Sequence, residues 1–248
     1  MQMKLFKYMH AKYALKVLRE RKIKVATVSD ANDPNEMIPN VMDDAGNHRM
    51  NSDEERRMLR RCYLGKHGFI SLSAEWDSNP MWGLYGDKFA GIALAFDVDL
   101  SNEPAGIFPV SYSAMRMELT NLELSEMRNP ENQANIARRL FAQKDKQWSF
   151  ENEWRRFVSL RECESKELDN GQLGYFANVD ACLTLAGVIL GPDCPYGIGS
   201  VQSALMGHEK EGFVCTCLGH DVESYAVRMI YREGWHEGRW RPYGLHVM

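Results

Sequence analysis

The sequence predicts a mixed α+β fold, and three observations lead to it. Strand-like and helix-like segments alternate irregularly, without the regular β-α-β order of a doubly wound fold. The chain has 248 residues, enough for one large domain with a sizeable core. Hydrophobic residues make up 44% and charged residues 26% of the chain, which is typical of globular proteins and not of disorder. We therefore expect one domain, residues 1–248.

The first half of the chain predicts five strands and three helices. Apolar runs predict strands at residues 4–9, 23–28, 68–73, 91–97 and 107–113. Residues 11–21 repeat apolar side chains at helical spacing and so predict an amphipathic helix. A capping box starting at Ser52 predicts a helix through about residue 63. Pro80 suits the first turn of a short helix over residues 80–86, and residues 29–40 are predicted to be a loop.

The second half continues the irregular alternation. Asn129 and Pro130 predict the start of a helix whose apolar face carries Ile136, Leu140 and Phe141. Residues 162–172 are charged and predicted to be a loop, and an apolar run ends at Gly191. We expect a helix at residues 199–206 and strands at residues 148–160, 213–218 and 225–231. Residues 161–248 would complete the fold begun by residues 4–160.

Glu151 and Glu153 are the most informative pair in the chain. If residues 148–160 form one strand, both carboxylates point from the same face and lie about 7 Å apart along the chain. Like charges at that range repel each other, so such a pair often marks a functional site. The alternative is a solvated strand face balanced by Arg155 and Arg156. The opposite face would then turn to the core with Phe150, Trp154, Val158 and Leu160.

Several classes of protein are disfavoured. The chain contains no Walker A loop, GxGxxG, HExxH or GxSxG motif. Its six cysteines include no CxxC pair and its seven histidines are scattered, so we expect no metal site. The net charge of −4 gives no general attraction to nucleic acid or anionic membrane. Because no apolar run approaches a membrane span or a signal peptide, we expect a cytoplasmic protein that does not contact membranes.

Five short passages, in order, resemble a known bacterial family, the domain of unknown function 2971. The family typically shows a KY start, an NDPxE turn, an FS strand, an MWxxY helix before a G-I strand, and an E-x-E-W-R strand. Asn35 stands where the family usually has an aromatic residue. The resemblance covers residues 4–160 and continues more weakly through Tyr231. The matching passages are residues 6–8, 32–36, 69–73, 81–86 with 91–94, and 148–155.

That family is in turn similar to the ADP-ribosyltransferases. This similarity implies a mostly antiparallel split β-sheet with flanking helices, and NAD as the substrate. It implies that Glu153 and Glu151 are catalytic, Glu153 as the essential glutamate and Glu151 as the residue that activates the acceptor. The position that usually holds His or Arg on the first strand would be occupied here by Lys7 or Tyr8, which would hold the NAD ribose. The implied NAD-binding residues are Lys7, Tyr8, Ser73, Trp82 and Tyr85.

These residue types suit the implied chemistry. Cleavage of the nicotinamide–ribose bond passes through an oxocarbenium-like state that a carboxylate stabilises. A second carboxylate can take a proton from the attacking nucleophile, and aromatic rings offer a stacking face for nicotinamide. The resemblance thus implies a metal-independent transferase that modifies a protein or a nucleic acid, in a toxin or phage-defence setting. An antitoxin or another regulatory protein would be a partner in that setting.

Two other hypotheses stay open. The chain could be a non-catalytic sensor or interaction module that binds a nucleotide, a reading favoured by the missing His or Arg on the first strand. Less favoured is a nuclease that uses Glu151 and Glu153 with a divalent metal, because only two acids cluster in the sequence.

Overall fold

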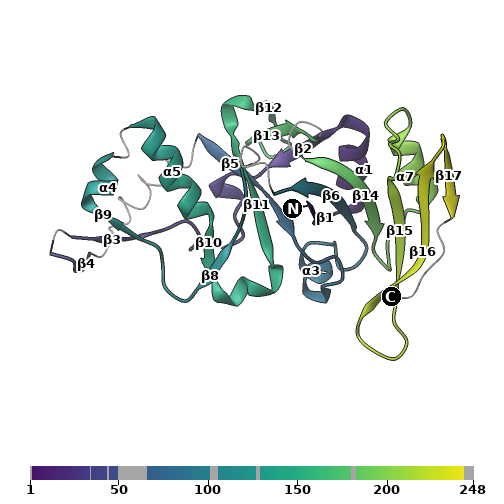
Figure 1. Ribbon diagram of the computed structural model, residues 1–248, viewed down its shortest axis with the longest axis horizontal. Coiled ribbons are helices and arrows are strands. Elements are labelled where there is room, and N and C mark those ends of the chain that lie inside the picture. The colour runs from purple at the N-terminus through teal and green to yellow at the C-terminus, as the bar shows by residue number, and fades with distance from the viewer. Residues whose placement is uncertain are drawn as a thin grey trace. The chain divides into compact units, whose positions relative to one another are not determined.

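The structure is a computed structural model, and its elements are shown in Figure 1. Its contacts divide the chain into two compact units. Unit 1 consists of residues 1–23, 72–105 and 178–248, and unit 2 of residues 24–71 and 106–177. The expectation of a single domain stays a prediction. The structure describes residues 2–33, 35–43, 45–49, 66–100, 106–126, 129–179 and 183–242.

Unit 1 begins with the strand and helix that the sequence predicts. Strand β1 (Gln2–Met9) pairs antiparallel along its whole length with β6 (Ile92–Asp99). Helix α1 (Ala11–Glu20) buries its predicted apolar face. It ends at Arg21, whose left-handed backbone lets the N–H donate to the carbonyl of Val17 and closes the last turn.

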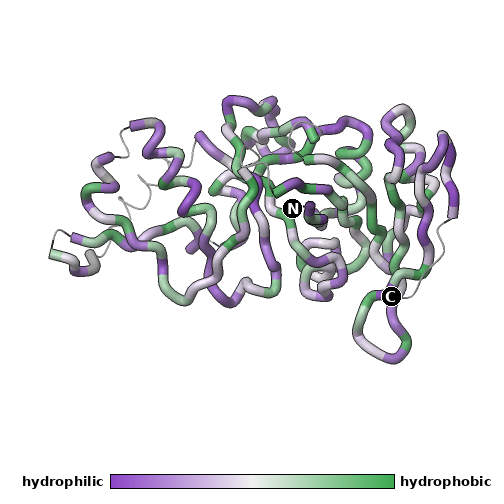
Figure 2. The backbone as a smooth tube through the Cα atoms, viewed as in Figure 1, coloured by the Kyte–Doolittle hydropathy of each residue, from purple (hydrophilic) through white to green (hydrophobic). Residues whose placement is uncertain are grey.

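The sheet of unit 1 is mostly antiparallel. Strands β14 (Thr184–Leu190) and β15 (Val214–His220) pair in parallel, and the other neighbouring strands described in this unit pair antiparallel. Helices α1 and α7 (Ile198–Leu205) contact each other and also contact β6 and β15, respectively. Hydrophobic residues concentrate on the central strands (Figure 2). The strand order is β17 (Arg239–Pro242), β16 (Val227–His236), β15, β14, β6, β1.

Unit 2 combines short strands with helices α4 (Asn121–Glu126) and α5 (Pro130–Phe141). As predicted, Asn129 caps α5, because its side chain accepts a hydrogen bond from the N–H of Glu131. Strands β5 (His67–Ser73), β11 (Glu153–Ser159) and β7 (Ile107–Pro109) are neighbours in that order. The core that α5 completes consists of Val28, Met37, Phe69, Phe108, Leu119, Ile136, Ala137, Leu140 and Phe141.

Smaller groups of strands surround this core. One group is β10 (Gln143–Asp145) beside β8 (Ser111–Ser113). Another is β12 (Glu164–Glu167), β13 (Leu173–Asn178) and β2 (Lys22–Val25). A third is β4 (His48–Arg49), β3 (Asn40–Met42) and β9 (Glu118–Thr120). The described part of the chain also contains α3 (Asn79–Leu84) in unit 1 and η1 (Val28–Asp30), η4 (Lys146–Glu151) and η5 (Leu160–Glu162) in unit 2.

The prediction of one strand over residues 148–160 is wrong. A 3-10 helix, η4, starts after Asp145, whose side chain accepts a hydrogen bond from the N–H of Gln147. It ends at Asn152, whose φ of 41° is left-handed, a conformation that Asn tolerates better than most residues. Strand β11 begins only at Glu153, so Glu151 and Glu153 do not share a strand.

Other boundaries also differ from prediction. The strand expected at residues 107–113 is divided into β7 and β8, and the strand expected at residues 23–28 ends at Val25. The charged segment predicted as a loop contains β12, and residues 29–40 contain part of η1. The helix predicted at residues 52–63 lies outside the described residues.

The mixed α+β prediction is confirmed at the level of a large, mostly antiparallel sheet with few helices. Among the described residues, every helix is too short or too polar to cross a membrane.

We expect Gly191→Ala to destabilise the protein by about 1–3 kcal/mol, because overpacking forces neighbours to shift. A Cβ at Gly191 would clash with the backbone oxygen of Phe89 and lie 3.0 Å from the ring of Trp82. Urea unfolding measures the change. Gly199→Ala is the matched control, since its Cβ would have no neighbour within 4 Å and it lies in α7. Equal stability of the two variants would contradict the packing argument.

Candidate functional site

Five charged side chains form a buried ion cluster in unit 2. They come from the 33–37 turn, β10, η4 and β11, and each residue is at most 7% exposed. Burying unpaired charge is expensive, so such groups must be paired and hydrogen-bonded to one another. We call this set the ion cluster: Glu36, Lys144, Glu151, Glu153 and Arg155.

Arg155 lies at the centre of the ion cluster and is 1% exposed. Its Nε and Nη2 atoms donate to the two oxygens of Glu153, at 2.7 and 2.8 Å. Nη2 also donates to Oε1 of Glu36, and Nη1 donates to the carbonyl of Phe141 at 2.9 Å. The guanidinium carbon lies 4.5 Å from the ring centre of Phe69. A planar fork of donors thus joins two acids, a helix end and an aromatic face, which lysine could not do.

Lys144 joins the two glutamates that the sequence singles out. Its Nζ lies 2.5 Å from Oε2 of Glu151 and 3.4 Å from Oε2 of Glu153. It also lies 4.9 Å from the ring centre of Trp148, a cation–π distance. The repulsion expected between the two carboxylates is therefore relieved by a cation placed between them.

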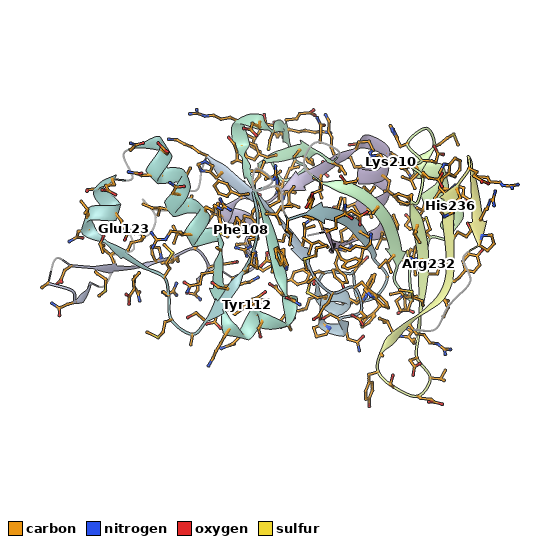
Figure 3. The ribbon with its side chains drawn as sticks, in the orientation of Figure 1. Phe108, Tyr112, Glu123, Lys210, Arg232 and His236 are labelled. Carbon is orange, nitrogen blue, oxygen red and sulfur yellow. The ribbon has the colours of Figure 1, made fainter. Side chains whose placement is uncertain are left out.

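The ion cluster keeps Glu153 ionised. Burial by itself raises the pKa of this carboxyl, but Arg155, Lys144 and the hydroxyl of Ser71 outweigh it and lower the pKa to about 2. The N–H of Glu153 donates to the hydroxyl oxygen of Tyr112 at 2.8 Å. Figure 3 labels Tyr112. Burial, assisted by the charge of Glu153, raises the pKa of Tyr112 to about 12, so the phenol stays neutral.

The alternative of a solvated strand face is wrong for these acids. On β11 the buried positions include Glu153 and Arg155, whereas Trp154 and Arg156 are only partly buried. The face predicted to turn to the core is thus the more exposed one at these positions.

Three other predicted residues meet in unit 1, around the backbone of Glu75. The hydroxyl of Tyr8 donates to the carbonyl of Glu75 at 2.8 Å, and Oγ of Ser73 accepts from its N–H at 3.1 Å. The ring of Trp82 meets Tyr8 edge to face at 4.9 Å. Its Nε1 donates to the carbonyl of Trp76.

These three residues are buried, with Trp82 0% and Ser73 1% exposed. Burial and then the charge of Asp77 raise the pKa of Tyr8 above its usual value. Each polar group is thus bonded within the fold of unit 1. Their proposed part in NAD binding stays a prediction.

Lys7 and Tyr85 are partly buried residues of unit 1. Lys7 pairs with Leu94 in the β1–β6 ladder, and adjacent strand residues point to opposite faces, so it leaves the sheet opposite Tyr8. Tyr85 caps the C-terminus of α3 through its N–H, which donates to the carbonyl of Met81. Glu151 and Glu153 belong to unit 2.

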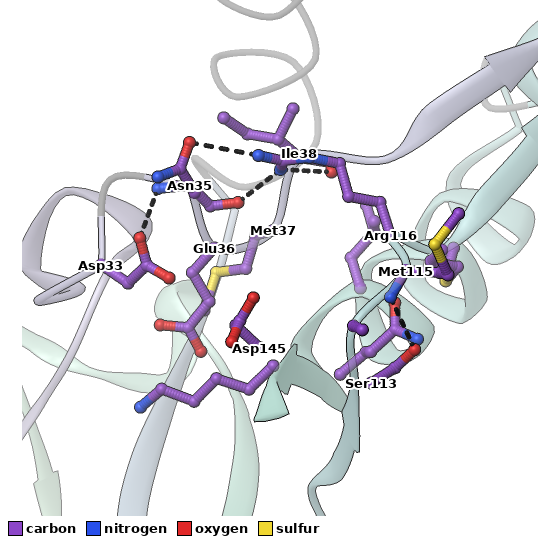
Figure 4. A pocket seen from close by; sticks show the side chains of 14 residues that line it. Asp33, Asn35, Glu36, Met37, Ile38, Ser113, Met115, Arg116 and Asp145 are labelled. Carbon is purple, nitrogen blue, oxygen red and sulfur yellow. Dashed lines mark hydrogen bonds between the residues drawn. The ribbon is translucent and has the colours of Figure 1, made fainter. Parts of the chain in front are cut away.

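A cavity of about 280 Å³ opens beside the ion cluster in unit 2 (Figure 4). Glu36 and Lys144 belong both to its wall and to the cluster. The described residues include no group of three or more His, Cys, Asp or Glu side chains placed to hold a metal ion. The wall consists of Asp33, Asn35, Glu36, Met37, Ile38, Ser113, Ala114, Met115, Arg116, Met117, Leu140, Gln143, Lys144 and Asp145.

The site prediction missed three members of the ion cluster. Glu36 and Arg155 carried a signal, since they end the NDPxE and E-x-E-W-R passages. Lys144 carried no sequence signal of burial or function, because a single lysine after a helix is usually exposed to solvent.

We expect Arg155→Met to lower the free energy of unfolding by about 3–5 kcal/mol, because Glu36 and Glu153 would stay buried without their cation. Urea unfolding at pH 7 measures this change. The exposed Arg161 provides the control, and Arg161→Met should change stability by no more than about 0.5 kcal/mol. If Arg155→Met also changes the free energy of unfolding by so little, the ion cluster contributes little to stability.

The low pKa of Glu153 predicts a pH dependence of stability. Its pKa is lower in the folded chain than the usual 4.5, so its stabilising contribution is complete above pH 4.5. That contribution is lost as the pH falls from 4.5 to about 2. The stability difference between the wild type and Glu153→Gln should therefore shrink across this window in urea unfolding. A stability difference between the two proteins that does not change with pH would contradict the low pKa of Glu153.

Comparison with known proteins matches one segment of the chain to a family. Residues 81–156 match the model of the family described as protein of unknown function (DUF2971), a segment that includes Trp82, Lys144 and the whole E-x-E-W-R passage. No curated protein and no solved structure matches the chain. The resemblance to DUF2971 drawn from the sequence is thereby confirmed for residues 81–156.

Proposed function

We propose that the chain is an ADP-ribosyltransferase-like enzyme that uses NAD and modifies a protein or nucleic-acid acceptor. The observation that carries the proposal is the ion cluster, in which three carboxylates face two cations. Its formal charge is therefore −1, held in a buried site beside a cavity. Fixed negative charge stabilises positive charge that develops on a ribose as nicotinamide leaves.

Glu153 suits the role of electrostatic stabiliser. It is ionised at neutral pH, and Arg155 holds both of its oxygens in place. A preorganised carboxylate of this kind needs no reorganisation as charge develops. Glu151 would accept a proton from the attacking group of the acceptor, and Lys144 would orient the carboxylate of Glu151. The toxin or phage-defence setting, with an antitoxin or other regulator as partner, rests on the family resemblance.

A second candidate is a non-catalytic module that senses a nucleotide. The specific observation in its favour is that both glutamates are at most 5% exposed and already paired with cations. A paired, buried carboxylate is a poor base, since its proton affinity is low. In this reading the fold binds NAD or ADP-ribose and the ion cluster stabilises the fold.

The two candidates differ in turnover. We expect wild-type protein incubated with labelled NAD and a panel of protein, RNA and DNA acceptors to release nicotinamide and to transfer label. Glu153→Gln should lower nicotinamide release by roughly 100-fold, as loss of a preorganised charge does in other enzymes. Release of nicotinamide is measured by chromatography, and label transfer on gels.

Glu167→Gln is the matched control, because it removes one negative charge from an exposed strand of unit 2. Thermal melting of both variants separates lost activity from lost folding. Binding of NAD or ADP-ribose by calorimetry, without nicotinamide release, would favour the sensor. If the protein neither binds NAD or ADP-ribose nor releases nicotinamide with any acceptor of the panel, both candidates are overturned.

A further inference from the structure

The cavity of unit 2 has a polar wall whose cations are already engaged. The charge of Lys144 is directed at Glu151 and Glu153. The guanidinium of Arg116 donates to the carbonyls of Asn35 and Ile38, at 2.7 and 3.1 Å (Figure 4). It also donates to the side-chain oxygen of Asn35. Both cations of the wall thus bond to groups of the protein.

Glu36 presents an unused acceptor to this cavity. Its side chain is 2% exposed, and Oε1 accepts a hydrogen bond from Arg155. Its Oε2 accepts no hydrogen bond from the residues that the structure describes. Oε2 is not among the fully buried side-chain atoms that lack a partner, so it stays accessible and can accept a hydrogen bond from a ligand. Because Glu36 lines the cavity, the ligand would donate from there.

Two further carboxylates line the same cavity (Figure 4). Asp33 uses Oδ1 to accept from the N–H of Asn35, and Asp145 uses Oδ1 to accept from the N–H of Gln147. An asparagine would make both of these hydrogen bonds equally well. The local structure therefore needs the Oδ1 atoms but not the negative charges.

Apart from the uncharged polar residues Asn35, Ser113 and Gln143, the rest of the wall is apolar and adaptable. Met37 and Leu140 are buried, whereas Met115 is 66% exposed at the edge. Methionine side chains adjust their shape to small apolar groups more easily than branched side chains do. The cavity therefore offers three carboxylates against two cations, together with adaptable methionine side chains.

We propose that this cavity binds a ligand with a cationic head, an ammonium or guanidinium group, on a short apolar chain. The head donates to Oε2 of Glu36 and is balanced by Asp33 and Asp145, while the chain packs against the methionine wall. The head could belong to a free small molecule or to a side chain of another protein, and the recognition chemistry is the same. This inference goes beyond the proposed NAD chemistry and does not depend on it.

Calorimetry with n-butylguanidinium tests the inference, and n-butylurea is its neutral control of the same shape. We expect n-butylguanidinium to bind the full chain at least roughly 10-fold more tightly, because charge-assisted hydrogen bonds are about twice as strong as neutral ones. A short peptide with one arginine forms a second arm. If the peptide binds more tightly, the cationic head belongs to a side chain of another protein. If n-butylguanidinium binds more tightly, the head belongs to a free small molecule.

Variants locate the binding in the cavity. Asp33→Asn and Asp145→Asn preserve the local hydrogen bonds, and together they should weaken n-butylguanidinium binding by roughly 5-fold or more. Asp43→Asn is the matched control, since Asp43 makes a similar turn outside the cavity wall of unit 2. Glu36→Gln should weaken binding further if it folds. Equal binding of n-butylurea, or equal weakening by Asp43→Asn, would overturn the proposal.

Discussion

The arrangement of unit 2 depends on one buried guanidinium. Arg155 is almost inaccessible to water, so its charge must be compensated inside the protein. Its compensation comes from Glu153, two residues earlier on the same chain, and from Glu36, 119 residues earlier. A long-range pair of this kind ties the 33–37 turn to β11 and specifies their relative position within the unit. Hydrophobic packing of the neighbouring core is less directional and would tolerate small shifts.

The same arginine explains why several short passages of the sequence occur together. Glu36 ends the NDPxE passage, Phe69 and Ser71 lie in the FS passage, and Arg155 ends the E-x-E-W-R passage. Arg155 bonds to Glu36 and covers the ring of Phe69, while the hydroxyl of Ser71 stabilises the ionised Glu153. Passages far apart in the sequence are thus parts of one electrostatic arrangement. In unit 1 a separate set, Tyr8 with Trp82, packs around the turn that follows β5.

Local patterns predicted the first strand, the first helix and the start of α5 well, because each carries its own signal. The amphipathic face of α1 and the Asn129 cap of α5 are examples. The region around Glu151 was predicted wrongly because its side-chain alternation mimics a strand, while the real break depends on the left-handed backbone of Asn152. Burial of charge could not be predicted either. A strand with Glu153 and Arg155 on one face resembles a solvated face unless Glu36 is known to meet it.

The ion cluster contains one carboxylate more than it contains cations, and this excess charge affects any chemistry in the cavity beside it. Three acids share two cations through a continuous set of ion pairs, so a positive charge added at one acid changes the pairing of the others. Glu36 and Lys144 carry this coupling to the cavity wall, since each belongs to both. A cation that enters the cavity would draw on the unbonded oxygen of Glu36 and weaken its hold on Arg155. Glu36 and Arg155 are therefore the contacts that join the cavity to Glu153.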